Sequence, residues 1–240
     1  MTAIANIIKD RKVYLGGVDL SGDENEVSLA IEFDQKECTT FPDSSHVTAP
    51  GLAKITLDQK GFVTFGEGLV DETLVARLGT AGVPVSVTQK GGVSGEIAYF
   101  TKAWGSSYAP SMKVGELPSF DFSMSQDAGE VIRGTILIAK TMLAAGEHLG
   151  TAFHVGAVPE GKKLFAALHV FDVASGSVDV VVQCDDAEGM ASPTDKITFA
   201  QHTDTGSEFK SAAGPITDSW WRVKVTVVGT ATIFVVVGIV

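Results

Sequence analysis

Apolar and polar side chains alternate along much of this chain with a period of two residues. In 27–33, the side chains of Val27, Leu29, Ile31 and Phe33 fall on one face of an extended backbone, and mainly polar neighbours fall on the other. Such alternation is typical of a β-strand with one buried face. Similar segments recur at 54–58, 83–87 and 120–125, and a more continuous apolar strand is expected at 131–138.

One segment has helical spacing instead. Leu74 and Leu78 fall on the same face of a helix over 71–78. Asp71 is a suitable N-cap residue at its start, and Gly79 follows its end. The sequence therefore predicts one short helix among many strands.

The second half of the chain is again rich in strand patterns. Two strands, 163–173 and 178–183, are predicted to form a hairpin about a turn at 174–177. A closing hairpin is expected at Gly229-Thr230, before a final apolar strand at 233–240 that is too short to span a bilayer. Strands at this density predict a β-sandwich or jelly roll.

Composition supports an all-β chain with a packed core. Of the 240 residues, 45% are hydrophobic and 20% charged, while Gly is abundant at 26 and Pro is scarce at 8. This balance favours many short strands joined by tight turns. Periodicity is lost and small residues collect at 141–151, where we expect a domain connection. We expect one β domain at 1–143 and a second, jelly-roll-like β-sandwich at 144–240.

The net charge of −11 is spread along the chain. Residues 1–140 hold 12 basic and 18 acidic side chains, and residues 141–240 hold 6 and 11. Sequence-independent DNA binding depends on clustered Lys and Arg, and the sequence has no such cluster. We therefore expect no tight binding of nucleic acid, although an acidic wall past which DNA slides is compatible with this charge.

No motif for catalysis stands out. The segment 92–95 (Gly-Val-Ser-Gly) is one residue short of the Gly-x-Ser-x-Gly elbow, so we interpret it as a turn. His154 and His169 flank a predicted hairpin region and could approach each other, but no His pair has metalloprotease spacing. Cys38 and Cys184 lie far apart and are expected to be free thiols. We expect no catalytic residue, no cofactor and no enzyme.

Two acidic clusters raise the question of calcium binding. The first is at 19–26, and the second joins Asp185 and Asp186 beside Gly189. Neither has the spacing of an EF-hand loop, so we interpret both as solvated turns and assign no metal. If one cluster binds calcium, Asp185 and Asp186 are the stronger candidates, because adjacent carboxylates and loop carbonyls suit that ion.

Trp220 and Trp221 are the best candidates for an aromatic binding surface. Neighbouring side chains on a strand point to opposite faces, so one indole should face the core and the other should face outward. We assign Trp221 to the surface of the second domain. There it could serve edge packing, a subunit contact or stacking against a glycan.

Short motifs follow one another in a recurring order along most of the chain. Residues 13–138 contain Val13-Tyr14-Leu15-Gly16-Gly17-Val18-Asp19-Leu20-Ser21, Glu37-x-Thr39-Thr40-Phe41, Gly51-Leu52, Gly82-Val83-Pro84-Val85, Gly115-Glu116 and Val131-Ile132-Arg133-Gly134-Thr135. Residues 150–240 contain Leu168-His169-Val170, Ser192-Pro193-Thr194-Asp195 and Thr217-Asp218-Ser219-Trp220-Trp221-Arg222. The first set resembles the tail-tube β domain of tailed bacteriophages. The second set is similar to small β-sandwich domains appended to phage virion proteins.

This resemblance implies a non-enzymatic structural protein of the virion. It implies a tail-tube-like β-barrel or sandwich with one flanking helix, which assembles with copies of itself into stacked rings, usually hexameric. Hairpins would line a lumen through which DNA passes without specific binding. Other virion proteins would be further partners, and a membrane would not be one. The protein would be located in the tail of the virion and would be assembled in the cytoplasm of the bacterial host.

The segment 34–50 is the expected place of subunit contact. It is 17 residues long without clear periodicity, and loops of that length in compact domains are usually functional or disordered. The residues that we expect to make the contact are Glu37, Thr39, Thr40, Phe41 and His46.

Two other functions stay open at this point. One is a head decoration or other minor virion protein that binds the capsid lattice. The other is a carbohydrate-binding module formed by the second domain.

Overall fold

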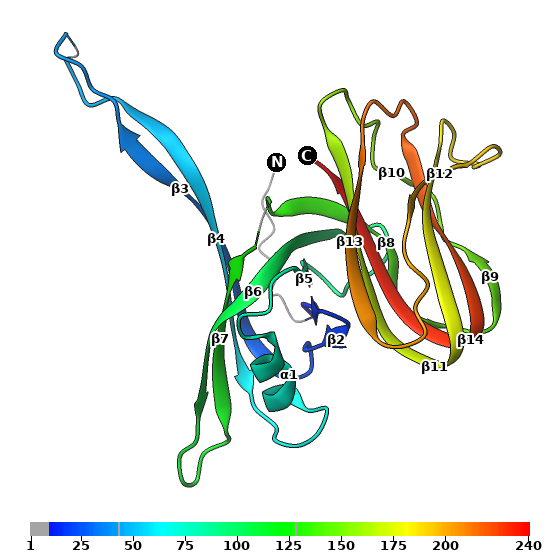
Figure 1. Cartoon of the computed structure of the whole chain (residues 1–240), viewed down its shortest axis with the longest axis horizontal. Helices are drawn as coiled ribbons and strands as arrows, with labels where there is room; N and C mark the ends of the chain where they lie inside the picture. The colour runs from blue at the N-terminus through cyan, green and yellow to red at the C-terminus, as the bar shows by residue number, and fades with distance from the viewer. Residues whose placement is uncertain (1–9, 43, 128) are drawn as a thin grey trace, which may run out of the picture. The chain divides into compact units, whose positions relative to one another are not determined.

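The computed structural model describes residues 10–42, 44–127 and 129–240. Strands make up 62% of the structure and helix 3%, so the expected mainly β class with one short helix is confirmed. Hydrogen-bond pairing joins 14 strands of the described residues into one antiparallel sheet, which is not closed (Figure 1). Of the two forms expected for the first domain, the closed barrel is therefore not observed in this part of the chain.

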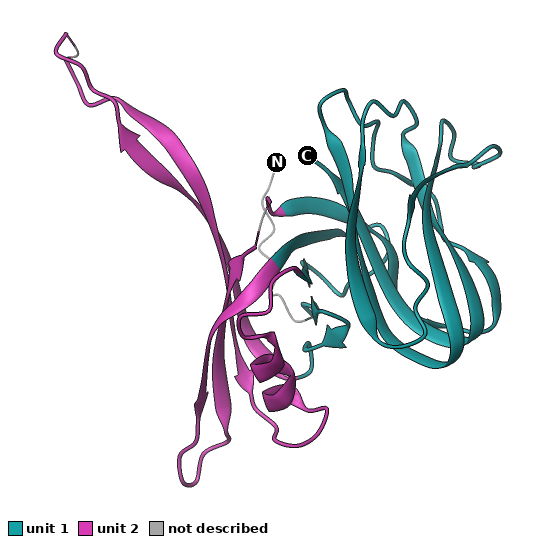
Figure 2. Cartoon of the chain, viewed as in Figure 1, with its two compact units in different colours: residues 1–22, 83–102, 132–240 teal, residues 23–82, 103–131 magenta. Residues whose placement is uncertain are grey.

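The chain forms two compact units, each built from separate stretches of sequence (Figure 2). Unit 1 comprises 1–22, 83–102 and 132–240, and unit 2 comprises 23–82 and 103–131. The expected boundary between residues 143 and 144 falls inside unit 1 in this division. Independent folding of the segments on either side of that boundary stays a prediction.

Unit 2 is a four-stranded antiparallel sheet with a helix. Its elements are β3 (Glu24–Glu37), β4 (Thr48–Phe62), α1 (Val70–Arg77), the 103–111 part of β6 (Ile97–Ser111) and β7 (Ser119–Gln126). The strands pair in the order β3-β4-β7-β6. The alternating pattern of 27–33 and 120–125 therefore identified β3 and β7 as strands. The predicted buried face is found in β7, but in β3 Ile31 and Phe33 are exposed.

Helix α1 lies where the spacing predicts it, but its start differs from the prediction. The N-cap position is Leu69, which makes no side-chain cap. Asp71 lies one residue inside the helix, and its carboxylate accepts a hydrogen bond from the Tyr108 hydroxyl at 2.7 Å. The backbone N–H of Asp71 donates to the carbonyl of Thr64, so a residue before the helix satisfies part of its first turn.

Unit 1 holds the remaining strands. They are β1 (Val13–Leu15), β2 (Val18–Asp19), β5 (Val83–Thr88), the 97–102 part of β6, β8 (Ile132–Leu143), β9 (Gly146–Leu149), β10 (Phe153–His154), β11 (Lys163–Asp185), β12 (Thr194–Thr198), β13 (Gly206–Ala213) and β14 (Trp220–Ile239). The longest two, β11 and β14, pair along almost their whole length.

Neither of the two hairpins expected in the second half is present. The chain passes through both predicted turns as continuous strand, and Gly176 of β11 pairs with Gly229 of β14. Both glycines have positive φ, and a Cβ on either one would collide with a backbone carbonyl of the opposite strand. This glycine pair, with register shifts beside it in β11, lets the ribbon bend where a turn was predicted.

Both arms of the bent ribbon contribute to one apolar core of unit 1, and one arm contributes to a second. In the first, Leu168 and Val170 of β11 pack with Val180 and Val223. In the second, Phe234 of β14 packs with residues of β1, β6 and β8. The 163–170 part of β11 contributes side chains to both cores. A nearly continuous apolar sequence fits a strand that is buried on both faces.

The segment 34–50 is strand at both ends, which shortens the expected 17-residue loop. β3 extends to Glu37 and β4 begins at Thr48, so the connection is reduced to 38–47. The outer halves of these strands pair only with each other among the described residues. A two-stranded ribbon with no element packed on it buries neither of its faces. Its sequence therefore lacks the alternation of apolar and polar residues by which the other strands were recognised.

We predict that Gly229→Ala lowers the free energy of unfolding by at least about 2 kcal/mol, because alanine is strained at positive φ and its methyl group meets the backbone of Ser175. Chemical denaturation measures this change. Gly189→Ala is the matched control, since no atom lies within 4 Å of its Cβ position. Equal stability of the two variants would contradict the bend.

Candidate functional site

The edges of the sheet in unit 2 are its first distinctive feature. β3 has β4 as its strand partner, and no further strand pairs with the other edge of Ser28–Glu37 within the described chain. At the other edge of the sheet, Gly105 of β6 forms an isolated β-bridge with Leu78, the residue that follows α1. From Ser106 to Ser111, β6 has β7 as its only described strand partner. Both edges therefore carry backbone groups that can pair with another chain.

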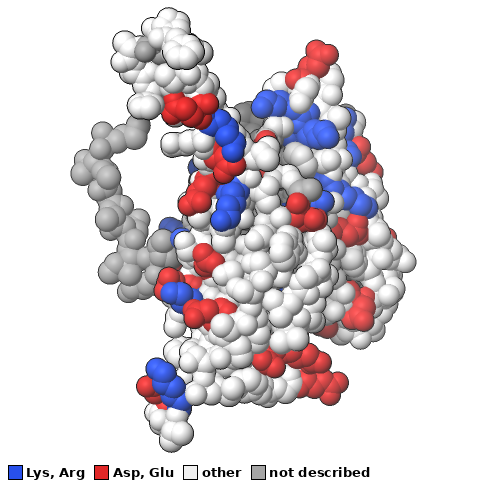
Figure 3. Space-filling view, turned by 60° about the vertical axis from the view of Figure 1, so that its left-hand side comes forward, with Lys and Arg blue, Asp and Glu red and all other residues white. Residues whose placement is uncertain are grey.

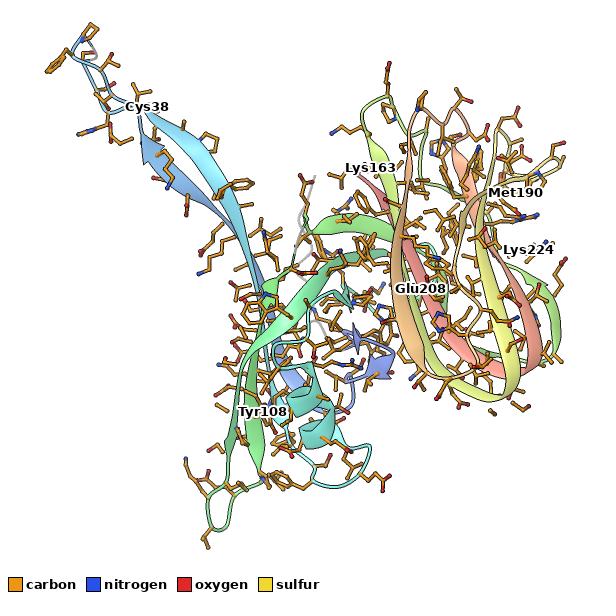
Figure 4. The ribbon with its side chains drawn as sticks, in the orientation of Figure 1. Cys38, Tyr108, Lys163, Met190, Glu208 and Lys224 are labelled. Atoms are coloured by element: carbon orange, nitrogen blue, oxygen red, sulfur yellow. The ribbon has the colours of Figure 1, made fainter. Side chains whose placement is uncertain are left out.

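One face of this sheet is apolar and covered by α1. Phe122 and Met124 of β7 and Leu57 of β4 are buried there, together with Leu74 of the helix. Gly105 permits the close approach of the helix end, because a Cβ there would lie 2.8 Å from the carbonyl oxygen of Arg77. Tyr108 lies beside the helix (Figure 4), and burial, followed by the nearby Asp71 carboxylate, raises the pKa of its hydroxyl.

The other face of the sheet is polar and uncovered within unit 2. Cross-strand pairs on this face include Ser28 with Asp58, Asp58 with Ser123, and Ser123 with Ser107. The Ser123 hydroxyl donates to the Asp58 carboxylate. We call this surface the polar face. Its members, by strand register, are Glu26, Ser28, Ala30, Glu32, Lys54, Thr56, Asp58, Lys60, Phe62, Trp104, Ser107, Ala109, Ser111, Ser119, Asp121, Ser123 and Ser125.

The β3–β4 hairpin carries all of the residues that the sequence predicted for subunit contact. Glu37, Thr39 and His46 lie together: the Thr39 hydroxyl donates to the Glu37 carboxylate, and the His46 ring lies 3.3 Å from the same carboxylate. Thr40 and Phe41 follow in the exposed connection. Cys38 is near the base of this tip (Figure 4). Contact of these residues with another subunit stays a prediction.

Exposed apolar side chains are concentrated in unit 2. Of 17 large hydrophobic residues that are exposed in the described chain, 13 belong to this smaller unit. Phe33 is 59% exposed and Leu52 is 81% exposed, both in the outer half of the hairpin. Large apolar clusters on the surface of a soluble protein commonly mark an interaction site.

In both acidic clusters, a carboxylate accepts hydrogen bonds from other groups of the protein. Both oxygens of the Asp185 carboxylate accept loop backbone N–H groups, from Ala187 at 3.2 Å and Ser192 at 2.7 Å. The bond from Ser192 is the main reason that the pKa of Asp185 is lowered. The adjacent carboxylate of Asp185 raises the pKa of Asp186.

Asp19, in the first acidic cluster, is also structural. Its carboxylate accepts hydrogen bonds from Lys140 at 2.7 Å and from Ser21. Burial by itself raises the pKa of Asp19, but these hydrogen bonds outweigh it and hold the pKa below its ordinary value. Within 10–42, 44–127 and 129–240, no group of three or more His, Cys, Asp and Glu side chains is placed to share a metal ion.

Trp221 is buried, which corrects its assignment to the surface. Its exposed fraction is 0%, and its indole N–H donates to the carbonyl of Gly156 at 2.8 Å. Trp220 is the partly exposed member of the pair, and its ring lies edge-on against His154. Alternation required one indole to face inward, but the sequence has no signal for which of the two it is.

A serine–histidine pair lies inside unit 1, which the sequence did not reveal. Ser86 and His169 are 83 positions apart in sequence, and their Oγ and Nε2 atoms lie 2.9 Å apart. Both side chains are fully buried, so no substrate reaches them. Burial lowers the pKa of His169 to about 3, which makes its imidazole a weak base. His154 and His169 have different partners and form no pair.

The two cysteines are free thiols, Cys38 exposed in unit 2 and Cys184 buried in unit 1. The Cys184 thiol donates to the Asp218 carboxylate at 3.0 Å. Burial raises the pKa of Cys184 to about 11, so the thiol is protonated at neutral pH and is not poised as a nucleophile.

Lys and Arg side chains are interspersed with Asp and Glu on the face shown in Figure 3. Examples in unit 2 are the ion pairs of Lys36 with Asp34 and of Lys60 with Glu26. In the described residues, no helix has the length and apolar character needed to cross a membrane.

The chain matches no protein-family model and no curated protein sequence. Solved structures are similar to it. The cap that terminates the tube of the anti-feeding prophage is 16% identical, with a TM-score of 0.44 over 56% of this chain and 95% of that chain. The SPP1 tail tube is 11% identical, with a TM-score of 0.40 over 54% and 80% of the two chains.

A third similar structure is the SPP1 Dit protein of the hub adsorption apparatus. It is 10% identical, with a TM-score of 0.36, and the match covers 97% of this chain and 100% of that one. The similar structures are thus tail-tube, tube-terminator and hub proteins of phages and phage-like injection systems, the class that the sequence resembles. At these identities and TM-scores we derive no function from them.

We predict that the free energy of unfolding falls as the pH drops from about 6.5 to about 3, because the pKa of His169 is about 3 in the folded chain and 6.5 when unperturbed. Between these values the unfolded chain binds a proton that the folded chain excludes. This residue then contributes up to about 1.4 kcal/mol per pH unit.

Denaturation between pH 7 and pH 4 measures this effect in the wild type and in His169→Gln, which keeps a hydrogen-bonding group toward Ser86 but takes up no proton. The variant should show a shallower loss of stability, and the control His154→Gln should follow the wild type. Identical slopes for the wild type and His169→Gln would refute the role of His169.

Proposed function

We propose that this protein is a non-enzymatic structural subunit of a phage tail that assembles into stacked rings to form the tail tube. The observation that carries the proposal is the sheet of unit 2, with one face covered by α1 and one largely polar face. Among the described residues, the outer edges of 28–37 in β3 and of 106–111 in β6 have no strand partner. The sequence resemblance in 13–138 supports the same function. The proposal places the protein in the virion tail and its assembly in the cytoplasm of the bacterial host.

Rings follow from the two different edges of one sheet. The edge of β3 in one copy can pair with the Ser106–Ser111 edge of β6 in the next copy. Such a contact joins unlike surfaces, and repeating it builds a ring when the rotation from one copy to the next closes. Backbone hydrogen bonds between the strands supply the pairing without a specific side-chain code.

The size of the ring favours six copies over three. Six sheets contribute about 24 strands, which at about 4.8 Å each give a backbone diameter of about 37 Å. Stacked sheets lie about 10 Å apart, so inward side chains take about 5 Å on each side and leave about 27 Å. Three copies leave only about 8 Å by the same reasoning. Six copies therefore give a channel for a DNA duplex, and three do not.

The polar face suits the wall of such a channel. It carries four carboxylates (Glu26, Glu32, Asp58 and Asp121) against two lysines (Lys54 and Lys60). The rest are Ser, Thr and Ala with two aromatic residues, Phe62 and Trp104. A mildly acidic surface offers no phosphate clamp, so DNA passes without being held. The opposite face is occupied by α1 and cannot serve this role.

Negative-stain electron microscopy of the purified full chain tests the proposal. We expect rings with six-fold symmetry and tubes made of such rings. Trimers, which a head decoration protein would form, or particles that remain monomeric would overturn the tail-tube function.

The hairpin extension gives a second test. We predict that replacing 36–49 by Asn-Gly abolishes tube growth while the monomer stays folded. The replaced residues lie beyond the Gln35–Pro50 pair, and Asn-Gly favours a two-residue hairpin turn. Circular dichroism checks the fold, and electron microscopy checks the tubes. Normal tubes from this variant would show that the hairpin makes no assembly contact.

A further inference from the structure

One sheet face of unit 1 points away from its apolar cores. It belongs to strands β10, β14, β11 and β12, which pair in this order (Figure 1). Trp221 and Val223 of β14 lie in the first core, so alternation places Trp220 and Arg222 on the opposite face. Strand register gives two neighbouring rows there, which we call the outer site: His154, Trp220 and Asp185 in one row, and Arg222, Gln183 and Asp195 in the other.

An aromatic pair lies at one side of the outer site. His154 of β10 and Trp220 of β14 are register partners, and their ring centroids lie 5.3 Å apart with the planes inclined by 76°. His154 is exposed and Trp220 is half-buried. The edge-on contact with His154 holds the indole in one orientation while part of it stays in contact with solvent.

A hydrogen-bonded row crosses three strands beside this pair. The Arg222 Nε–H donates to the side-chain carbonyl of Gln183 at 3.0 Å, and the Gln183 amide donates to the Asp195 carboxylate at 2.7 Å. Gln183 is buried, so its amide is held at both ends. Arg222 has further N–H donors and Asp195 has a second carboxylate oxygen. The row therefore presents a donor and an acceptor whose positions are fixed before a ligand binds.

The size of the outer site favours a small ligand over a protein. Trp220 and Arg222 are two residues apart on one strand, so the rows lie about 7 Å apart, and a row that crosses three strands is about 10 Å long. A stable protein interface covers about 800 Å² of each partner, far more than this area. The large apolar residues exposed on the described part of unit 1, which would extend a protein interface, lie outside both rows: Val93, Met142, Leu149 and Val228.

The charges of the outer site disfavour an anionic ligand. Arg222 is accompanied by two carboxylates, Asp185 and Asp195. Asp185 is engaged by the backbone N–H groups of its own loop, and Asp195 by Gln183. A phosphate or sulfate group would meet one guanidinium and two carboxylates, so its attraction to the first is offset by repulsion from the others. A neutral ligand with both donors and acceptors suits this site better.

We propose that the outer site binds a neutral carbohydrate. The C–H groups of a sugar ring stack on the face of the Trp220 indole, because that face carries partial negative charge. Each sugar hydroxyl both donates and accepts, so Arg222 donates to one hydroxyl and Asp195 accepts from another. A flat aromatic surface beside a few fixed polar groups is the general form of a small-molecule site.

This proposal goes beyond the proposed function and does not depend on it. It also differs from the glycan stacking that the sequence left open for Trp221, since that indole is buried. The residues that hold the sugar are Trp220, Arg222 and Asp195. Gln183 is a positioning residue, because it fixes the two polar side chains and is itself buried.

Binding of the full chain to an array of neutral and anionic bacterial glycans tests the proposal. We expect retention on at least one neutral glycan, which then serves as the probe in titrations. Trp220→Ala should weaken binding of that glycan at least about tenfold, because it removes the stacking surface. Asp195→Asn keeps an acceptor for Gln183 but removes the charge, and should weaken binding to a smaller extent.

The matched control is Thr226→Ala, an exposed residue of the same strand outside both rows, which should bind as the wild type does. Circular dichroism checks that each variant is folded. His154→Ala, which truncates an exposed side chain, replaces Trp220→Ala if that variant does not fold, and it should also weaken binding.

Retention of no neutral glycan, binding to sulfated or phosphorylated glycans alone, or equal affinity of Trp220→Ala and the Thr226→Ala control would each overturn the carbohydrate site. Tubes that bind no glycan would leave the tail-tube function standing. A chain that binds a neutral glycan but forms no tubes would overturn that function and leave the carbohydrate site standing.

Discussion

Every β-strand has two edges of backbone hydrogen-bonding groups, and the structure of this protein depends on how those edges are paired. In unit 1, β14 is paired on both sides, with β11 along one edge and with β8 and β9 along the other. In unit 2, the edges of β3 and of the 106–111 part of β6 face no further strand in the described structure. Unpaired edges are an aggregation hazard unless a partner covers them. In the proposed tube, the neighbouring copies of the chain cover them.

Buried and exposed apolar residues are divided between the two units in the same way as paired and unpaired strand edges. Unit 1 buries its apolar residues in two cores around β11 and β14. Unit 2 buries one face of its sheet under α1 and leaves most of the exposed large apolar residues of the described chain on its hairpin, loops and helix. A two-stranded ribbon such as the outer β3–β4 hairpin is only marginally stable alone. Contacts with another copy would provide the burial that unit 2 lacks within one chain.

Three side chains of potentially reactive type, His169, Cys184 and Asp185, pack in the interior or close a loop. His169 and Cys184 are buried, one with its pKa lowered and the other with its pKa raised, so both are neutral at physiological pH. Asp185 closes the loop after β11 through two backbone N–H groups. These roles account for His169, Cys184 and Asp185 without a metal centre, and no group of three or more metal-ligating side chains is present in the described structure.

The sequence by itself determined the class of the fold, the apolar and polar faces of the alternating strands and the position of α1. It did not determine burial, since the apolar face of β3 is exposed at Ile31 and Phe33. These features depend on local periodicity, which each segment carries within a few residues. The bend at Gly176 and Gly229 was not predictable in this way, because a glycine in a turn and a glycine at a bend look alike until the opposite strand is known. The strands within 34–50 were missed since a ribbon without a buried face shows no alternation. Only the tertiary structure decided that Trp221 faces the core and that Ser86 meets His169, because burial depends on partners distant in sequence.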